Sequence, residues 1–286
     1  MAKSKKDMEG GLGIHARRAI AYIVLIIISF FCLFWFYIMF INATRSKGEL
    51  KAGFTALPSD HLLTNWNNLV HGTLPIWSGM FNSLIIAAAT AVLCVYFSTM
   101  TAYAIHAYDF KLKKFIYPFI LMIMMIPTQV TALGFIKLIT GMGLMDSFIP
   151  LIVPAWFGGG AFYIFLLRQF YLGIPKDFDE AAYLDGASHI QIFTKIILPI
   201  TKPALAVVGM FAFLNSWNDF LSPLVYLNSE KKYTVALGLQ LFTGSYRGEW
   251  NLMMAAACLV LAPVVVVFAI GQKYLIEGVT MSGVKG

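Results

Sequence analysis

Residues 179–187 read Asp-Glu-Ala-Ala-Tyr-Leu-Asp-Gly-Ala, and after residues 188–195 the chain continues as Ile-Ile-Leu-Pro and Ile-Thr-Lys-Pro to Pro203. This is the longest polar interruption on one side of a chain that is otherwise mostly apolar. Segments long enough to cross a bilayer lie before and after it. The placement predicts a loop through which a membrane protein contacts a partner on the cytoplasmic side.

The composition predicts that lipid surrounds most of the chain. Of 286 residues, 59% are hydrophobic and only 12% are charged, and the mean hydropathy is +0.75. Soluble domains approach twice that share of charged residues. The net charge of +7 would suggest nucleic acid in a soluble protein, but here the basic residues flank apolar segments. Orientation in a membrane explains them better, so nucleic acid is not expected as a partner.

The apolar runs predict an all-α polytopic membrane protein with six transmembrane helices. The predicted spans are 19–41, 80–106, 115–139, 147–167, 204–227 and 252–274. Residues 1–79 would hold a basic cytoplasmic N-terminus, the first span and an outer loop. Residues 80–276 would form a five-helix core with a cytoplasmic coupling loop at 169–203, and residues 277–286 a cytoplasmic tail. Pro127, Pro154 and Pro263 fall within spans and would kink them, either as ordinary bundle shaping or around an internal cavity.

The distribution of basic residues tests this arrangement. Six spans place both termini on one side, and 14 of the 21 lysines and arginines then fall on the proposed inner side. The seven on the outer side include three in the first outer loop, Arg45, Lys47 and Lys51. Because positive residues accumulate on the cytoplasmic side, we expect both termini to be cytoplasmic.

Few residues could support catalysis or bind a cofactor. The sequence has no Gly-rich phosphate-binding loop, so ATP is not expected to bind to this chain. Its three cysteines lie inside apolar runs, and its five histidines have no metal-ligand spacing, so no metal site is expected. Asp219 is the one acidic residue inside a predicted span. The chain is therefore predicted not to be an enzyme, and any energy source must come from a partner.

The predicted fifth span nevertheless carries polar residues at intramembrane depth. Asn215, Asn218 and Asp219 fall on one helical face, which they share with Phe211 and Ser222. Such residues either line a water-filled substrate path or bond to another helix. Asp219, near the outer end, could instead reach the surface or pair with a lysine. A weaker path candidate, Gln129, lies beside the kink at Pro127.

The loop itself contains a predicted short helix. Pro175 and the acidic residues at 177 and 179 are typical of a helix start. Ala182 and Gly186 would form a flat face for close approach, while Tyr183 and Leu184 offer apolar contact. The helix is suited to docking against a moving soluble domain. The alternative is an interfacial helix that packs back on its own bundle.

The motifs of the loop resemble those of a known family. Glu180-Ala181-Ala182, Asp185-Gly186-Ala187 and Ile197-Leu198-Pro199 resemble the cytoplasmic loop of permease subunits of binding-protein-dependent ABC importers, and within them the MalG type of sugar importer. Asn82-Ser83, the polar pattern from Asn215 to Pro223 and the tail from Gly278 to Gly286 also match that subgroup. The resemblance covers about residues 80–286.

The resemblance implies the type I importer fold and a multi-pass protein of the bacterial inner or plasma membrane. It implies a heterodimer with a second, unlike permease, two ATPase subunits that bind ATP and Mg, and an extracellular sugar-binding protein. The cargo would be an oligosaccharide or other sugar; the alternative is a permease for a non-sugar solute such as an amino acid or phosphonate. The tail Ser282 to Gly286 would reach the ATPase, and the ATPase-coupling residues would be Glu180, Ala181, Ala182, Asp185 and Gly186.

Overall fold

The computed structural model describes residues 5–72, 75–157, 159–175, 177–245 and 248–283, with side chains described for all of these except 5–13, 177, 242–245 and 277–283. Every regular element in these residues is a helix, which confirms the all-α prediction. The chain divides into two compact units. The first comprises Met1–Gly72 and Tyr246–Leu259, and the second comprises Thr73–Ser245 and Val260–Gly286.

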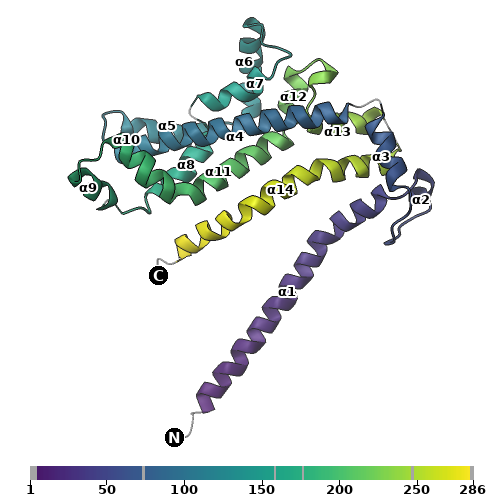
Figure 1. Ribbon diagram of the computed structural model, residues 1–286, viewed down its shortest axis with the longest axis horizontal. Coiled ribbons are helices and arrows are strands. Elements are labelled where there is room, and N and C mark those ends of the chain that lie inside the picture. Colours follow the sequence, from purple (N-terminus) through teal and green to yellow (C-terminus); the bar gives the residue numbers. More distant parts are fainter. Residues whose placement is uncertain (1–4, 73–74, 158, 176, 246–247, 284–286) are drawn as a thin grey trace. The chain divides into compact units, whose positions relative to one another are not determined.

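The first unit gathers around the end of the long helix α1 (Lys5–Ala43). Two short helices, α2 (Lys47–Lys51) and α3 (Leu62–Val70), follow it, and the first turns of α14 (Trp250–Gly283) belong to the same unit (Figure 1). The buried amide of Asn65 lies at the centre. Its Nδ2 donates to the carbonyl oxygens of Ala43 and Arg45, each at 2.8 Å, and its Oδ1 accepts from Asn251 Nδ2 at 2.7 Å. Asn65 therefore joins the end of α1 to α3 and α14.

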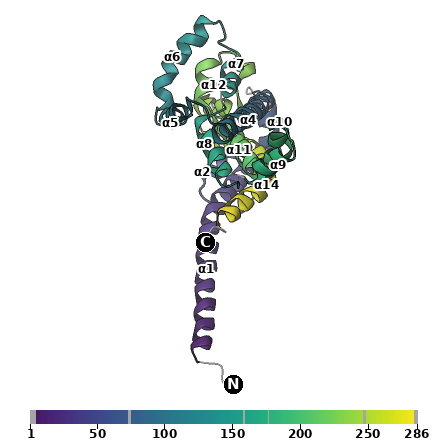
Figure 2. The same ribbon diagram turned by 90° about the vertical axis from the view of Figure 1, so that its left-hand side faces the viewer.

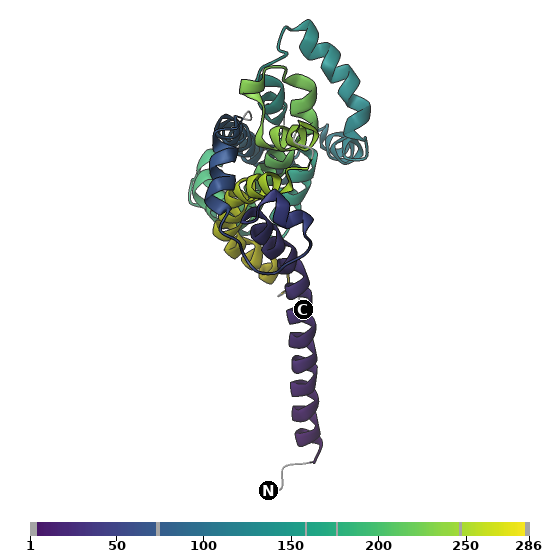
Figure 3. The same cartoon turned by 90° about the vertical axis from the view of Figure 1, so that its right-hand side faces the viewer.

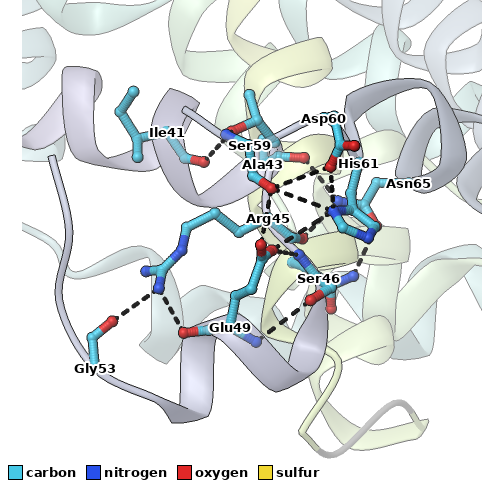
Figure 4. A network of polar contacts seen from close by, with 12 residues as sticks. Ile41, Ala43, Arg45, Ser46, Glu49, Gly53, Ser59, Asp60, His61 and Asn65 are labelled. Carbon is cyan, nitrogen blue, oxygen red and sulfur yellow. Dashed lines mark hydrogen bonds and ion pairs between the residues drawn. The ribbon is translucent and has the colours of Figure 1, made fainter. Parts of the chain in front are cut away.

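A polar network shapes the loop that leaves α1 (Figure 4). The Arg45 guanidinium donates to the carbonyl oxygens of Glu49 and Gly53. Ser46 and Glu49 form a capping box at the start of α2, in which Ser46 N donates to Glu49 Oε2 at 2.7 Å. That hydrogen bond, followed by one from the Ser59 hydroxyl, lowers the pKa of Glu49. The network fixes the path of the chain where the first span ends.

Two long helices form the core of the second unit. The helices α4 (Ile76–Ala107) and α11 (Leu198–Asn218) pack side by side, and α8 (Ala161–Tyr171) packs against both (Figure 1). Gly209 makes this close packing possible, since a Cβ there would lie 3.3 Å from Val95 Cγ2. Leu167 and Val208 are fully buried in the shared core.

The other helices of this unit surround the core. They are α5 (Lys113–Ile123), α6 (Thr128–Gly141), α7 (Ile149–Ile152), η1 (Val153–Trp156), α9 (Asp177–Leu184), α10 (His189–Ile192), η2 (Phe193–Ile197), α12 (Leu221–Tyr226), η3 (Glu230–Lys232), α13 (Val235–Ser245) and the later part of α14. Figure 1 shows α9 and α10 at one end of the α4–α11 pair and α12 and α13 towards the other.

The membrane-spanning helices agree with the predicted number. Five segments are long and apolar enough to cross a membrane: Ile14–Ala43, Ile76–Ala107, Ile149–Tyr171, His189–Asn218 and Trp250–Ile276. A sixth consists of α5 and α6, which pass the same test together but are bent by 99° (Figures 2 and 3). The six predicted spans are thus present if the bent pair counts as one.

The three prolines predicted to kink helices behave differently. Pro127 stands at the break between α5 and α6, where its extended backbone starts the new helix. Pro154 lies in the η1 turn, which separates α7 from α8. Pro263 remains inside the continuous helix α14. Proline therefore accompanies a helix break at Pro127, a 3₁₀ turn at Pro154 and an uninterrupted helix at Pro263. A helix can continue through a proline where other groups satisfy the freed backbone carbonyl.

The fifth span lies earlier in the chain than residues 204–227, where hydropathy placed it. Helical structure runs from His189 through the π-helical turn η2 and α11 to Asn218, a span of 30 residues. The first two turns contain polar residues such as Lys195 and Thr194, which lowered the local apolar signal. At the other end, the backbone of Asp219 is extended and stops the helix.

Candidate functional site

The predicted loop helix is present between α8 and α10. It begins at Asp177, as the acidic start signal indicated, and ends at Leu184. Gly186 N donates to Tyr183 O and Ala187 N donates to Ala182 O, both at 3.0 Å, which is the Schellman arrangement of a helix end. Gly186 has a φ of +79°, a left-handed conformation that glycine adopts at little cost. Gly186 therefore sets where the helix stops.

The flat face predicted from Ala182 and Gly186 is not present. Because α9 ends before Gly186, the two residues do not share a helical face. Ala182 is only 7% exposed and belongs to the buried core of its own unit. Glu180, Ala181 and Asp185 are exposed. Among the predicted coupling residues, three thus face outward, one packs inward and one ends the helix.

Large apolar side chains are exposed around this helix. Leu184 is 89% exposed and Ile190 is 75% exposed, and Phe178 and Tyr183 are about half exposed. Several large apolar side chains exposed within one short segment indicate a contact surface. We call Phe178, Tyr183, Leu184 and Ile190 the loop patch.

A second candidate region lies at the end of α11. Phe211, Asn215 and Asn218 are exposed on one face of this helix, as their spacing predicted. Asn218 Nδ2 donates to Leu214 O at 2.9 Å, within its own helix. Asn215 has no hydrogen bond to another helix among the described residues. This face is available to a water-filled path or to a partner chain.

Asp219 and Ser222 do not belong to that face. The helix ends at Asn218, and Asp219 Oδ1 accepts the backbone N–H of Ser222, in the first turn of α12, at 3.1 Å. The prediction that 215, 218, 219 and 222 form one helical stripe is therefore wrong for the last two. The ion pairs found in the described part of the chain do not include Asp219, so the expected pairing with a lysine is not seen there.

Gln129 lies in a small cavity between α6 and α12. The cavity has a volume of about 200 Å³, and Thr128, Thr131, Ser222 and Tyr226 also line it. Pro127 precedes the first turn of α6, and residues of that turn and of α12 line the cavity together. The side chains that line the cavity are neutral, with amide and hydroxyl groups beside apolar ones.

An aspartate that the sequence did not single out organises the loop between α6 and α7. Asp146 accepts hydrogen bonds from Ser229 Oγ at 2.6 Å and from the backbone N–H groups of Asn228 and Ser229 at 3.0 Å, and it pairs with Lys232 at 3.0 Å. These bonds, those from Ser229 first, hold the pKa of Asp146 well below its usual range. Its positive φ of 56° is tolerated by aspartate and favours this geometry.

The Asn82-Ser83 motif also holds the segment 228–235, which Asp146 contacts. Asn82 Nδ2 donates to the carbonyl oxygens of Lys231 and Tyr233, at 2.9 and 3.0 Å, and Ser83 Oγ accepts from Val235 N at 2.8 Å. A Cβ at Gly79 would lie 3.4 Å from the Val235 backbone, so α4 and this segment approach closely. The segment 228–235 is thus fixed between α4 and Asp146.

Two further predictions concern a metal site and the C-terminal tail. In the described part of the chain, no group of three or more His, Cys, Asp or Glu side chains could hold a metal ion. The helix α14 continues to Gly283, and the predicted contact of the tail Ser282 to Gly286 lies outside the described side chains.

Comparison with known proteins defines the class of this chain. Residues 104–280 match the family described as binding-protein-dependent transport system inner membrane component. The matched region includes the loop patch, α11 and most of α14. The chain belongs to this family of membrane permease subunits, and its spans make it a multi-pass membrane protein.

Individual relatives are similar over nearly the whole chain. The arabinooligosaccharides transport system permease protein AraQ of Bacillus subtilis is 33% identical over 262 residues, covering 91% of this chain and 92% of AraQ. The sn-glycerol-3-phosphate transport system permease protein UgpE of Escherichia coli is 32% identical, covering 87% and 91%. A chain of a bacterial ABC transporter that imports alginate shares the fold, with a TM-score of 0.77 at 23% identity, covering 96% of this chain and 99% of that one.

Proposed function

We propose that this chain is one of two unlike permease subunits of an ATP-driven importer, and that it forms half of the path for an oligosaccharide. The observation that carries the choice of cargo is the similarity to AraQ, which extends over 91% of the chain at 33% identity. Alternating access would be driven by partner ATPases that bind ATP and Mg. The protein would lie in a bacterial plasma membrane with both termini cytoplasmic and would receive cargo from an extracellular binding protein.

The loop patch supports the proposed contact with an ATPase. Leu184 and Ile190 expose most of their surface in a segment that lies at the end of the α4–α11 pair. Burial of such side chains in a groove of a partner would supply the binding free energy, at roughly 1.5–3 kcal/mol for each fully buried leucine or isoleucine. The exposed Glu180 and Asp185 would orient the contact.

A second permease would cover surfaces that this chain leaves open. The apolar span Ile14–Ala43 is mostly exposed, and its two buried residues, Ile41 and Ala43, lie in its last turn. In the second unit, an apolar groove of about 700 Å³ separates α14 from α4 and α11. Small residues line it, among them Ala91, Ala206 and Gly209, and they allow a helix backbone to approach closely.

The polar residues of the proposed path suit a neutral cargo. Asn215, Asn218 and Gln129 offer amide donors and acceptors, which match sugar hydroxyls. A phosphorylated cargo would call for lysine or arginine, and the described residues that line the cavity of Gln129 include neither. Asp219 accepts a hydrogen bond from Ser222 and would lie at the edge of the path, where it shapes the turn between α11 and α12.

The relative UgpE supports one other cargo class. Its name specifies sn-glycerol-3-phosphate, and its identity to this chain is almost equal to that of AraQ. The experiment on the cargo must therefore test both an oligosaccharide and sn-glycerol-3-phosphate. An amino acid or phosphonate remains the alternative derived from the loop motif alone.

The proposal is tested by measuring ATP hydrolysis in proteoliposomes that contain this chain, its candidate permease and ATPase partners and a binding protein. We expect stimulation by binding protein loaded with an oligosaccharide and none with sn-glycerol-3-phosphate. The reverse pattern would replace the cargo and keep the permease. A fully assembled complex in which no loaded binding protein raises hydrolysis would refute the sugar importer.

A matched pair of variants tests the loop patch in the same vesicles. Leu184→Ser should abolish most of the stimulation, because it removes the most exposed apolar side chain of the patch. Leu112→Ser is the control, since Leu112 is 62% exposed in the turn between α4 and α5 and lies outside the patch. Equal stimulation in both variants would contradict the assignment of the patch.

A further inference from the structure

The helix α9 is held to its own unit by few contacts. Ala182 is its one buried residue among those with described side chains, and α9 packs extensively against no other helix in the described part of the chain. A small buried side chain contributes little packing energy. A helix attached in this way moves easily, and its movement reaches the spans only if a specific contact transmits it.

Such a contact begins at Tyr183, near the end of α9. The Tyr183 hydroxyl hydrogen-bonds His189 Nδ1, and the two rings meet edge to face with centroids 5.0 Å apart. His189 is the first residue of α10, and Ser188 and Gln191 form a capping box around it, with Ser188 N donating to Gln191 Oε1 at 2.8 Å. His189 is therefore fixed to the helical run that continues to Asn218.

On its other side, His189 contacts the end of α4. Its ring centroid lies 5.3 Å from that of Tyr108, the C-cap residue that directly follows α4. Tyr108 in turn meets the ring of Tyr103 at 6.2 Å, and Tyr103 packs on Phe193 of η2 at 4.7 Å. One imidazole thus touches the loop helix and the end of a membrane span.

The series ends in the packed core of the second unit. Tyr103 and Tyr171 are both buried, and their rings lie 5.9 Å apart, which joins α4 to α8. Aromatic pairs at such distances contribute beyond their buried area. A displacement of Tyr108 would therefore move packed helices and would not be absorbed by loose side chains.

We infer that His189 is a positioning residue that transmits movement of α9 to α4 through its hydrogen bond with Tyr183 and its ring contact with Tyr108. This inference rests on the proposed function, in which α9 docks on a partner ATPase. We call the three residues the Tyr183–His189–Tyr108 link. Histidine suits the position because it combines a flat ring with a hydrogen-bonding nitrogen. Phenylalanine keeps only the ring, and asparagine keeps only a hydrogen-bonding group near the place of Nδ1.

The first test measures amide hydrogen exchange of residues 177–188 in the assembled transporter. His189→Phe and Tyr183→Phe should each raise exchange of this segment about threefold to tenfold, which is the range expected for one lost hydrogen bond. The double variant should exchange no faster than either single variant, because both changes remove the same bond. Unchanged exchange in the single variants, or effects that multiply in the double variant, would overturn the link.

The second test measures cargo taken up per ATP hydrolysed. We expect His189→Phe and His189→Asn to lower this ratio at least about twofold while basal hydrolysis persists. His189→Ala removes both the hydrogen bond to Tyr183 and the ring contact with Tyr108, so it should lower the ratio further than either of them. Matched controls are His71→Phe and Tyr37→Phe, which alter hydrogen bonds within the first unit, to Asn67 and Ala56. A merely structural residue would lower uptake and hydrolysis together and leave the ratio constant, which would refute the inference.

The two tests separate failure of the link from failure of the proposed function. If the wild-type assembly hydrolyses ATP but transports no sugar, the cargo is wrong, and the exchange experiment still decides whether His189 holds α9. If the wild type couples uptake to hydrolysis and the His189 variants match the His71→Phe control, the link is refuted and the proposed function stands.

Discussion

Gly159 provides a sharp test of the packing between α4 and α8. It precedes α8 with a φ of +77°, and a Cβ there would lie 2.0 Å from Ser98 Oγ, 2.7 Å from Ser98 N and 2.8 Å from Cys94 O. Two of these atoms belong to the backbone of α4, so a rotamer change cannot relieve the overlap. In the native protein this close approach lets Gly160 N donate to the buried Ser98 hydroxyl at 3.2 Å.

The cost of Gly159→Ala follows from two contributions. A left-handed conformation costs a non-glycine residue about 1–2 kcal/mol. Forcing a methyl group into a packed contact costs about 1–3 kcal/mol more. We therefore expect a loss of about 2–5 kcal/mol in the free energy of unfolding.

Gly186→Ala is the matched control. Gly186 has nearly the same φ, +79°, but a Cβ there would meet nothing within 4 Å. It should lose only the conformational part, about 1–2 kcal/mol, and that loss is confined to the end of α9. The difference between the two variants isolates the steric cost.

Thermal unfolding of the purified assembly measures this difference at one scan rate. With about 2–4 °C per kcal/mol for a domain of this size, the Tm of Gly159→Ala should lie about 2–12 °C below that of Gly186→Ala. A second variant, Gly159→Ala with Ser98→Gly, removes the hydroxyl but not the backbone contacts, so it should recover only part of the loss. Equal Tm values for Gly159→Ala and Gly186→Ala would refute the close approach.

Three further predictions concern the segment 228–235 and the proposed substrate path. Asn82→Ala removes the donors to Lys231 O and Tyr233 O and should lower the free energy of unfolding by about 1–3 kcal/mol. Limited proteolysis within residues 228–235 should become faster. The control is Asn228→Ala, which should not change the rate because this side chain is exposed and makes no described hydrogen bond. Asp146→Asn should lower Tm at neutral pH and remove the part of the pH dependence of Tm that Asp146 causes. Because the pKa of Asp146 is depressed in the folded protein, its contribution to stability is complete above about pH 5 and is lost as the pH falls below about 4. Melting curves from pH 3 to 7 that keep a constant gap between the two proteins would contradict this. Replacing both Asn215 and Asn218 with alanine should reduce sugar uptake or its apparent affinity several-fold without lowering basal ATP hydrolysis, and unchanged uptake would remove them from the path.

Local sequence signals predicted the helices well because hydropathy and proline chemistry act on neighbouring residues. The apolar runs indicated six spans, and Pro127 indicated the break that the structure shows as a 99° bend. The acidic residues after Pro175 indicated the start of α9 at Asp177. The boundaries of the fifth span were less accurate, because Thr194 and Lys195 lowered the apolar signal of a segment that is nevertheless helical.

The candidate site was predicted in part. The loop motif identified the segment that carries the loop patch, and the spacing of Asn215 and Asn218 identified an exposed face. The grouping of Asp219 with them failed because a helical period assumes that the helix continues, whereas α11 ends at Asn218 and Asp219 accepts a hydrogen bond from the first turn of α12. Asp146 was missed, since nothing around it in the sequence indicates partners more than eighty residues away.

Composition, short motifs and local periodicity were enough to indicate that this chain crosses a membrane several times, where most helices lie and to which family it belongs. The buried side of α9, the contacts of Asn82 and Asp146, and the need for glycine at position 159 became apparent only in the folded chain. Those facts depend on atoms brought together from distant parts of the chain. Their distances follow from packing of the folded helices, which no local pattern records.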